Sequence, residues 1–225
     1  MNASPNGPEV DGYAQAAPGL MLHLAARVFS DAPPRLSVPA AYIFGQTPDN
    51  EGSVLKAAAR LIASNSAELL LIPESRPWSG YGGDAHWRSV LPALGVPPER
   101  IASVPTRGFD NRNTLTEAMS LAGVVAAAGW RDLSILAPPF HLLRAFVTTA
   151  SVFTRRLPDV RVYAAAGLPQ PWLDPAVHSQ GTLRAPRSEL LGCEFDRLVR
   201  YRRKGDLLGP GEILAYLDRR DAVPG

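Results

Sequence analysis

Residues 133–146 read LSILAPPFHLLRAF, and this stretch predicts a strand, a sharp turn and the start of a helix. The apolar run Leu133–Ala137 is typical of a buried strand, and Pro138 and Pro139 end it. An apolar segment resumes at once, with His141 and Arg144 three positions apart. Because proline is favoured at the first position of a helix, we expect a helix to begin here. A strand that leads directly into a helix is the repeating unit of a parallel α/β sheet.

The same alternation runs through most of the chain. Strand-like runs are expected at Ala40–Phe44, Glu68–Ile72, Ile101–Val104, Leu133–Ala137 and Val160–Ala164. Between them, two apolar stripes with helical spacing begin at Val54 and Leu115, and the second ends before Gly129, where a helix-terminating glycine is expected. The sequence therefore predicts an α/β fold with a doubly wound, mostly parallel five-stranded sheet. The common strand order 3-2-1-4-5 places the ligand site between the first and fourth strands, at their carboxyl ends.

The two ends of the chain lack this alternation. We expect residues 1–18 to be a disordered tail, because MNASPNGPEVDGYAQAAP has no apolar periodicity. Residues 19–225 then form one domain, with a short helix near 20–29 and a long loop over 166–185. Two closing helices, Arg187–Lys204 and Gly211–Arg219, are expected in a C-terminal helical extension over 186–220.

Composition and charge exclude several classes of protein. Lys plus Arg is 23 against 21 for Asp plus Glu, so the net charge of +2 gives no case for nucleic-acid binding. The single cysteine, Cys193, forms no internal disulfide, and no Cys/His spacing indicates a metal site. The apolar stretch GLMLHLAARVF is about half of the ~20 residues that span a bilayer. We expect a cytoplasmic protein with no membrane partner, and the sequence leaves the oligomeric state open.

Two features of the first closing helix have ordinary structural interpretations. The basic run RLVRYRRKG at 197–205 is interpreted as a solvated face near the helix end, where cations are favourable. Cys193 lies among Leu190, Leu191 and Phe195, so we interpret it as a packed core thiol.

The stretch after the first strand is a candidate ligand site. In IFGQTPDN, residues 43–50, Gly45 lets the backbone approach a ligand, and Gln46 is a candidate ligand-binding residue beside it. Asp49 fits either a ligand contact or an ordinary helix N-cap, and the sequence leaves both open.

The stretch RGFDNRNTLTEA, residues 107–118, combines a predicted cap with ligand candidates. Thr114 and Glu117 match a capping box, so we predict a capping role for Glu117. Asp110 and Asn111 exceed what a cap needs, and Asp110 is a candidate catalytic residue. Asn111, Asn113 and Thr114 are candidate ligand-binding residues that would orient a substrate.

The loop after the second strand, PESRPWSGYGGDAHW at 73–87, is rich in glycine and aromatic residues. Trp78 or Tyr81 could stack on a flat ring of a ligand, and His86 is a candidate ligand-binding residue. A surface loop with scattered aromatic residues explains the same pattern equally well.

His141 and Arg144 form the sharpest candidate pair. A cation near a helix N-terminus costs about 0.3–1 kcal/mol, and such departures from local rules concentrate at functional sites. An anionic ligand held by the helix N-terminus and by Arg144 would remove this cost. We therefore interpret Arg144 as an anion clamp and His141 as a general acid/base. This interpretation predicts that Arg144→Ala weakens ligand binding and changes stability by no more than about 1 kcal/mol.

Over roughly residues 38–165, the order of these pieces resembles the YdcF-like domain family, which includes the SanA and ElyC cell-envelope proteins. Gly45, GVPPERI (95–101), NTLTEA (113–118) and above all PPFHLLRAF (138–146) carry the resemblance. It implies a Rossmann-like fold and, for some members, a nucleotide-like ligand such as S-adenosylmethionine. SanA and ElyC types carry a membrane anchor, and this chain looks more like the soluble branch. Members of the family typically have a Ser-Gly-Gly turn directly after the second strand, whereas in PESRPWSGYGG of this chain the glycines come later. We expect His86 at the place where members have a glutamate in the next helix.

Two classes of function follow from these residues. The first is an enzyme that binds a small anionic or nucleotide-like molecule and transfers or hydrolyses a group, with S-adenosylmethionine or another nucleotide as cofactor and no metal. The second is a non-catalytic nucleotide or S-adenosylmethionine sensor, in which segment 166–185 reports occupancy to a partner. An accessory role in envelope assembly is a weaker alternative, which the resemblance alone suggests.

Overall fold

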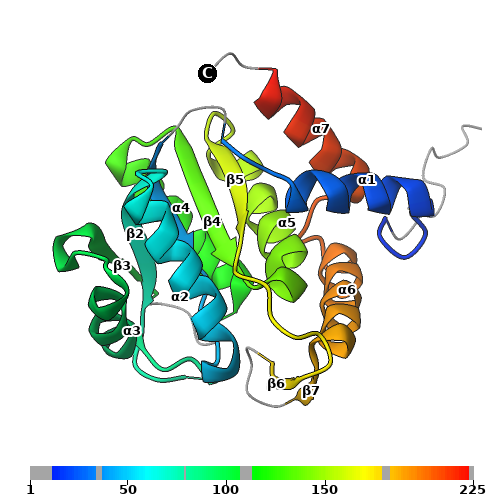
Figure 1. Cartoon of the computed structure of the whole chain (residues 1–225). Helices are drawn as coiled ribbons and strands as arrows, with labels where there is room; N and C mark the ends of the chain where they lie inside the picture. Colours follow the sequence, from blue (N-terminus) through cyan, green and yellow to red (C-terminus); the bar gives the residue numbers. More distant parts are fainter. Residues whose placement is uncertain (1–11, 34–36, 79, 107–112, 179–182, 223–225) are drawn as a thin grey trace, which may run out of the picture.

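The computed structural model describes residues 12–33, 37–78, 80–106, 113–178 and 183–222 (Figure 1). The helices are α1 (Pro18–Phe29), α2 (Pro48–Ala63), α3 (Asp84–Val90), α4 (Thr114–Ala128), α5 (Pro139–Arg156), α6 (Arg187–Arg203) and α7 (Pro210–Asp221), with short 3-10 turns η1 (Leu91–Leu94) and η2 (Pro98–Arg100). The strands are β1 (Val38–Ile43), β2 (Ala67–Glu74), β3 (Ile101–Pro105), β4 (Asp132–Ala137), β5 (Arg161–Ala166), β6 (Pro175–Val177) and β7 (Arg184–Pro186).

The central sheet confirms the predicted fold class. Its five strands are all parallel and lie in the order β3-β2-β1-β4-β5, with helices on both faces. Side chains of β1 alternate between two hydrophobic cores, because successive strand residues point to opposite faces. Tyr42 belongs to the core beneath α4, α5 and α7, whereas Ala41 and Ile43 belong to the core beneath α2 and α3. This Rossmann-like arrangement places the switch point between β1 and β4, as expected.

The segment expected to be a long loop contains a second, small sheet. β6 and β7 pair antiparallel, with Ala176 opposite Ala185. Each strand has only three residues, too few to show the alternation from which a strand is predicted. Residues 179–182 between them lie outside the described residues.

The predicted disordered tail is wrong for residues 12–18. Tyr13 is 1% exposed in the main core, and its hydroxyl donates a hydrogen bond to the Leu208 carbonyl at 2.9 Å. One buried aromatic residue leaves no periodic pattern, so this contact could not be predicted from the sequence. Residues 1–11 lie outside the described residues, and the expectation for them stays a prediction.

The C-terminal helices pack on the same core as the sheet. Ile213 and Leu217 of α7 are fully buried there, and Arg220 forms a buried ion pair with Asp31, which follows α1. Among the described helices, none is both long enough and apolar enough to cross a membrane.

Candidate functional site

The loops after β1 and β4 meet at the switch point, and a helix begins directly after each. α5 begins at Pro139 with Pro138 as its N-cap, as the two prolines predicted. α2 begins at Pro48 with Thr47 as its N-cap. Asp49 is therefore not the N-cap of α2. Of the two roles left open for Asp49, a ligand contact or an N-cap, the N-cap is wrong.

Arg144 is 3% exposed and has an internal anion as its partner. Its Nε and Nη2 atoms donate to the carboxylate of Glu194, which comes from α6. Its Nη1 donates to Thr114 Oγ1 at 2.7 Å, and Nη2 also lies 3.0 Å from His141 Nε2. The anion beside this cation is thus part of the protein. Replacing Arg144 would break this buried ion pair, so the structure argues against the expectation that the replacement leaves stability nearly unchanged.

Glu194 is the centre of this polar network. It is 3% exposed, and its carboxylate also contacts His178 and accepts a hydrogen bond from Arg197 at 3.0 Å. Burial opposes its ionisation, but the cation of Arg144 and the hydrogen bonds from His178 and Arg144 outweigh burial. The pKa of the Glu194 carboxyl is therefore held well below its usual range, and the group stays ionised.

Sequence reasoning missed Glu194, His178 and Arg197. Arg197 opens the basic run that was interpreted as a solvated face, whereas its guanidinium reaches the buried carboxylate. The i, i+3 spacing of Glu194 and Arg197 was the one available signal, and His178 had none.

His141 is a neutral part of the same network. Burial, followed by the nearby Arg144 cation, lowers the pKa of His141 to about 3. A guanidinium only donates hydrogen bonds, so Nε2 accepts from Arg144 and the ring proton lies on Nδ1. Nδ1 faces the amide nitrogen of Gln46 at 3.1 Å, while Gln46 Oε1 has no partner among the described residues. Exchanging the amide oxygen and nitrogen of Gln46 would let Oε1 accept the Nδ1 proton, at the loss of the 3.3 Å hydrogen bond from Nε2 to the Phe44 carbonyl.

The capping box of α4 lies one residue earlier than predicted. Asn113 is the N-cap, and its side chain accepts from the N–H groups of Leu115 at 2.9 Å and Thr116 at 3.2 Å. The Thr116 hydroxyl accepts from the N–H of Asn113 in return. The predicted box of Thr114 and Glu117 is therefore wrong.

Glu117 instead points to the end of β1. Its Oε2 accepts from the Gly45 N–H at 3.1 Å and from the Tyr42 hydroxyl at 2.8 Å. Burial, and then the neighbouring Glu117 carboxylate, raise the pKa of Tyr42 well above its ordinary value, so Tyr42 remains a donor. A partly exposed carboxylate thus stands at the carboxyl edge of the sheet, beside the predicted glycine.

The aromatic loop after β2 lies partly at this edge. A Cβ placed on Gly45 would lie 3.6 Å from Cγ of Tyr81, so the Tyr81 ring packs against this glycine. Tyr81 is buried, and its hydroxyl donates to the Pro73 carbonyl, whereas Trp78 is 51% exposed. His86 contacts Glu51 of α2 at 2.8 Å, and its hydrogen bonds do not join it to the His141 network.

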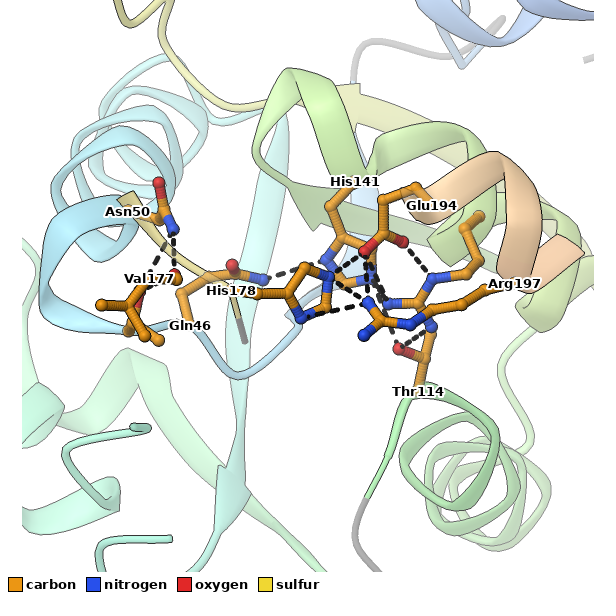
Figure 2. A network of polar contacts seen from close by, with 10 residues as sticks. Gln46, Asn50, Thr114, His141, Val177, His178, Glu194 and Arg197 are labelled. Atoms are coloured by element: carbon orange, nitrogen blue, oxygen red, sulfur yellow. Dashed lines mark hydrogen bonds and ion pairs between the residues drawn. The ribbon is translucent and has the colours of Figure 1, made fainter. Parts of the chain in front are cut away.

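The first turn of α2 holds the segment that contains β6. The carboxylate of Asp49 accepts from the Val177 N–H at 2.8 Å. The Thr47 hydroxyl and the Asn50 amide both donate to the Val177 carbonyl, at 2.9 and 3.1 Å (Figure 2). This contact brings His178, the next residue, to the Glu194 carboxylate.

Some predicted site residues stand outside this geometry. Asp110 and Asn111 lie outside the described residues. Among the residues that the structure describes, no group of His, Cys, Asp or Glu side chains could hold a metal ion.

No protein-family model matches the chain, and no curated protein matches it either.

Proposed function

We propose that the protein binds a small nucleotide-like molecule at the carboxyl edge of β1 and β4, with S-adenosylmethionine as the first ligand to test. The observation that carries the proposal is the Glu117 carboxylate, which the Gly45 N–H and the Tyr42 hydroxyl hold at that edge. Doubly wound sheets take their ligands at this switch point. An oriented acceptor at the ligand-binding edge supports binding of a molecule that offers hydrogen-bond donors.

The chemistry of this edge favours a nucleoside over a phosphate. Carboxylates near the switch point of dinucleotide-binding folds accept hydrogen bonds from ribose hydroxyls. A phosphate would meet the negative Glu117, which already occupies the Gly45 N–H. Both α2 and α5 also have proline in their first turn, which removes one N–H donor from each helix start. A ligand with hydroxyl or ammonium groups, such as S-adenosylmethionine, fits better than a phosphate-rich nucleotide.

Trp78 supplies a flat surface for the base of such a ligand. Trp78 and Tyr81 exchange backbone hydrogen bonds of 3.0 and 2.9 Å across a tight turn. Directly opposed residues of an antiparallel bridge point to the same side, so the exposed indole lies on the side of the Tyr81 ring. Stacking on an aromatic ring contributes about 1–3 kcal/mol per base where it has been measured.

A catalytic form of this proposal, group transfer or hydrolysis at the same edge, is the second candidate. The partly exposed Glu117 carboxylate favours it, because a carboxylate at this edge could take a proton from the bound ligand while the buried Tyr42 hydroxyl holds it in place. His141, the expected acid/base, is a neutral acceptor of the Arg144 hydrogen bond in the free protein. A sensor needs only to bind the ligand, whereas an enzyme also converts it. Turnover of the ligand therefore distinguishes the two forms.

Isothermal titration calorimetry of the full chain tests the binding proposal. S-adenosylmethionine and adenosine should bind, and ATP should bind more weakly than adenosine. Glu117→Gln should weaken S-adenosylmethionine binding about 10- to 150-fold, the equivalent of one charge-assisted hydrogen bond. Glu99→Gln, on η2 before β3, makes the same change at the opposite edge of the sheet and should leave affinity unchanged. Equal affinities for the two variants, or no binding of any adenosine compound, would contradict the proposal.

A further inference from the structure

Arg187, the first residue of α6, is a buried cation that has no counter-ion among the described residues. It is 7% exposed, and its hydrogen bonds go to neutral acceptors. Nε donates to the Asn50 side-chain oxygen at 3.1 Å, and the two terminal nitrogens donate to the carbonyls of Pro171 and Asp49. In the described part of the chain no carboxylate forms an ion pair with it. Buried charges are normally paired, so a bound anion would compensate the charge of this guanidinium.

The guanidinium still has donors for such an anion. It carries five N–H groups, and the three hydrogen bonds use one on each nitrogen. Arg187 lines a pocket of about 220 Å³, whose other walls are Pro139, Phe140, Pro169, Gln170 and Trp172. The pocket is larger than the ~150 Å³ cavity that accommodates a benzene molecule. Its walls are mainly apolar, so they suit the apolar part of an anion whose charged end meets Arg187.

A larger apolar groove adjoins this pocket. The groove has a volume of about 720 Å³ and shares Pro139, Phe140 and Trp172 with the pocket. One wall comes from α1 and the other from α6, with Leu143 of α5 between them. Its acidic lining residue, Glu194, is already paired with Arg144, so it does not leave an unpaired negative charge in the groove.

The rim of the groove exposes large apolar side chains from both helices. Leu22 and Phe29 of α1 are 71% and 43% exposed, and Leu191 and Phe195 of α6 are 40% and 37% exposed. Leu191 and Phe195 were expected to pack Cys193 in the core, and that expectation is wrong. Apolar side chains that gather on one surface of a soluble domain mark a binding site more often than isolated ones do.

We propose that the pocket and groove bind a long-chain carboxylate, a fatty acid anion. The carboxylate accepts hydrogen bonds from Arg187, and the chain runs past Phe140 and Trp172 into the groove between α1 and α6. The unpaired buried cation selects an anionic head, and the adjoining groove selects a long apolar tail. This site is separate from the Glu117 edge and does not depend on the function proposed for it.

Isothermal titration calorimetry of the full chain with hexanoate, octanoate, decanoate and dodecanoate tests the tail. Affinity should rise about fourfold per added methylene, as expected when each is buried. Dodecan-1-ol, which lacks the charge, should bind about 10- to 150-fold more weakly than dodecanoate. An affinity that does not change with chain length would overturn the role of the groove. That result is expected if the groove instead binds a helix of a partner protein. Equal binding of the alcohol would overturn the role of Arg187.

Variants locate the site on the protein. Arg187→Met should reduce dodecanoate affinity to that of the alcohol, with the thermal midpoint recorded as a control for folding. Because Arg187 also holds the segment before α6, Phe195→Glu provides a second test at an exposed position. It should weaken dodecanoate binding at least tenfold, whereas Leu173→Glu, at an 81% exposed residue outside the lining, should not. Equal affinities for Phe195→Glu and Leu173→Glu would overturn the proposal even if Arg187→Met fails to fold.

Discussion

Arg144 on α5 and Glu194 on α6 form a buried ion pair across 50 residues of sequence, with side chains 4% and 3% exposed. The pair explains why a cation lies close to the start of α5. The charge that the helix dipole disfavours is compensated by a carboxylate from another helix. Arg144 therefore links α5 to α6 and also fixes His141 and Thr114 at the edge of the sheet.

Breaking this pair should be costly. Arg144→Ala and Glu194→Ala should each lower the free energy of unfolding by about 3–5 kcal/mol, because each leaves a buried charge without its partner. The double variant should cost less than the sum of the two single changes. Urea denaturation measures all three. Asp159→Asn, which breaks an exposed pair with Arg131, is the control and should cost no more than about 1 kcal/mol. Additive effects of the two alanine changes would contradict the pairing.

The N-cap of α4 gives a second test. Asn113→Ala should destabilise the protein by about 1 kcal/mol, because the N–H groups of Leu115 and Thr116 lose their acceptor. Asn113→Asp should keep most of the stability, since aspartate caps equally well. Thermal unfolding of both variants at one pH checks the assignment. If Glu117→Gln were the more destabilising change, the cap would involve Glu117 after all.

Tyr13 gives a third test, on the segment that the sequence did not predict to fold. Tyr13→Phe should cost about 1 kcal/mol through the lost hydrogen bond to the Leu208 carbonyl. Tyr13→Ala should cost about 3–5 kcal/mol, as for other buried aromatic side chains replaced by alanine. Urea denaturation measures both values. Tyr13→Ala with wild-type stability would show that residues 12–18 contribute nothing to the core.

The fold could be predicted because its signals are local. Apolar runs, helical stripes and punctuating residues such as Pro138, Pro139 and Gly129 lie within a few positions of the elements they define. The carboxyl edge, with Gly45 and His141, follows from the strand order that such units adopt.

The contacts at the site could not be predicted in the same way. Glu194 lies 50 residues from Arg144, on a helix whose sequence pattern gives no hint of that partner. Glu117 was misassigned because two adjacent residues, Asn113 and Thr114, are both good caps. Successive residues of a helix point about 100° apart, so a cap that lies one residue earlier changes the direction expected for Glu117. Its side chain then faces the Gly45 N–H and not the cap.

The contact between Asp49 and Val177 gives a fourth test. Asp49→Ala removes the acceptor of the Val177 N–H, so hydrogen exchange at the Val177 amide should speed up by at least tenfold. The midpoint of thermal unfolding should change little, because Asp49 does not stand at the N-cap position of α2. Asp174→Ala, which removes a nearby carboxylate without this bond, is the control. Unchanged exchange at Val177 in Asp49→Ala would contradict the contact.

The neutral state of His141 gives a test in the pH dependence of stability. The pKa of His141 is lowered to about 3 in the folded protein, chiefly by burial, and is about 6.5 in an unfolded chain. As pH falls below about 6.5, the unfolded state therefore binds a proton that the folded state does not, and stability is lost by up to about 1.4 kcal/mol per pH unit. Urea denaturation between pH 6.5 and 5 measures this slope, since the lowered pKa of Glu194 adds a loss of the same sign mainly at lower pH. His141→Gln should flatten the slope over this range, whereas His23→Gln, which removes an exposed imidazole from α1, should keep it. Parallel slopes for wild type and His141→Gln would mean that folded His141 accepts a proton near neutral pH, which would restore it as the candidate acid/base.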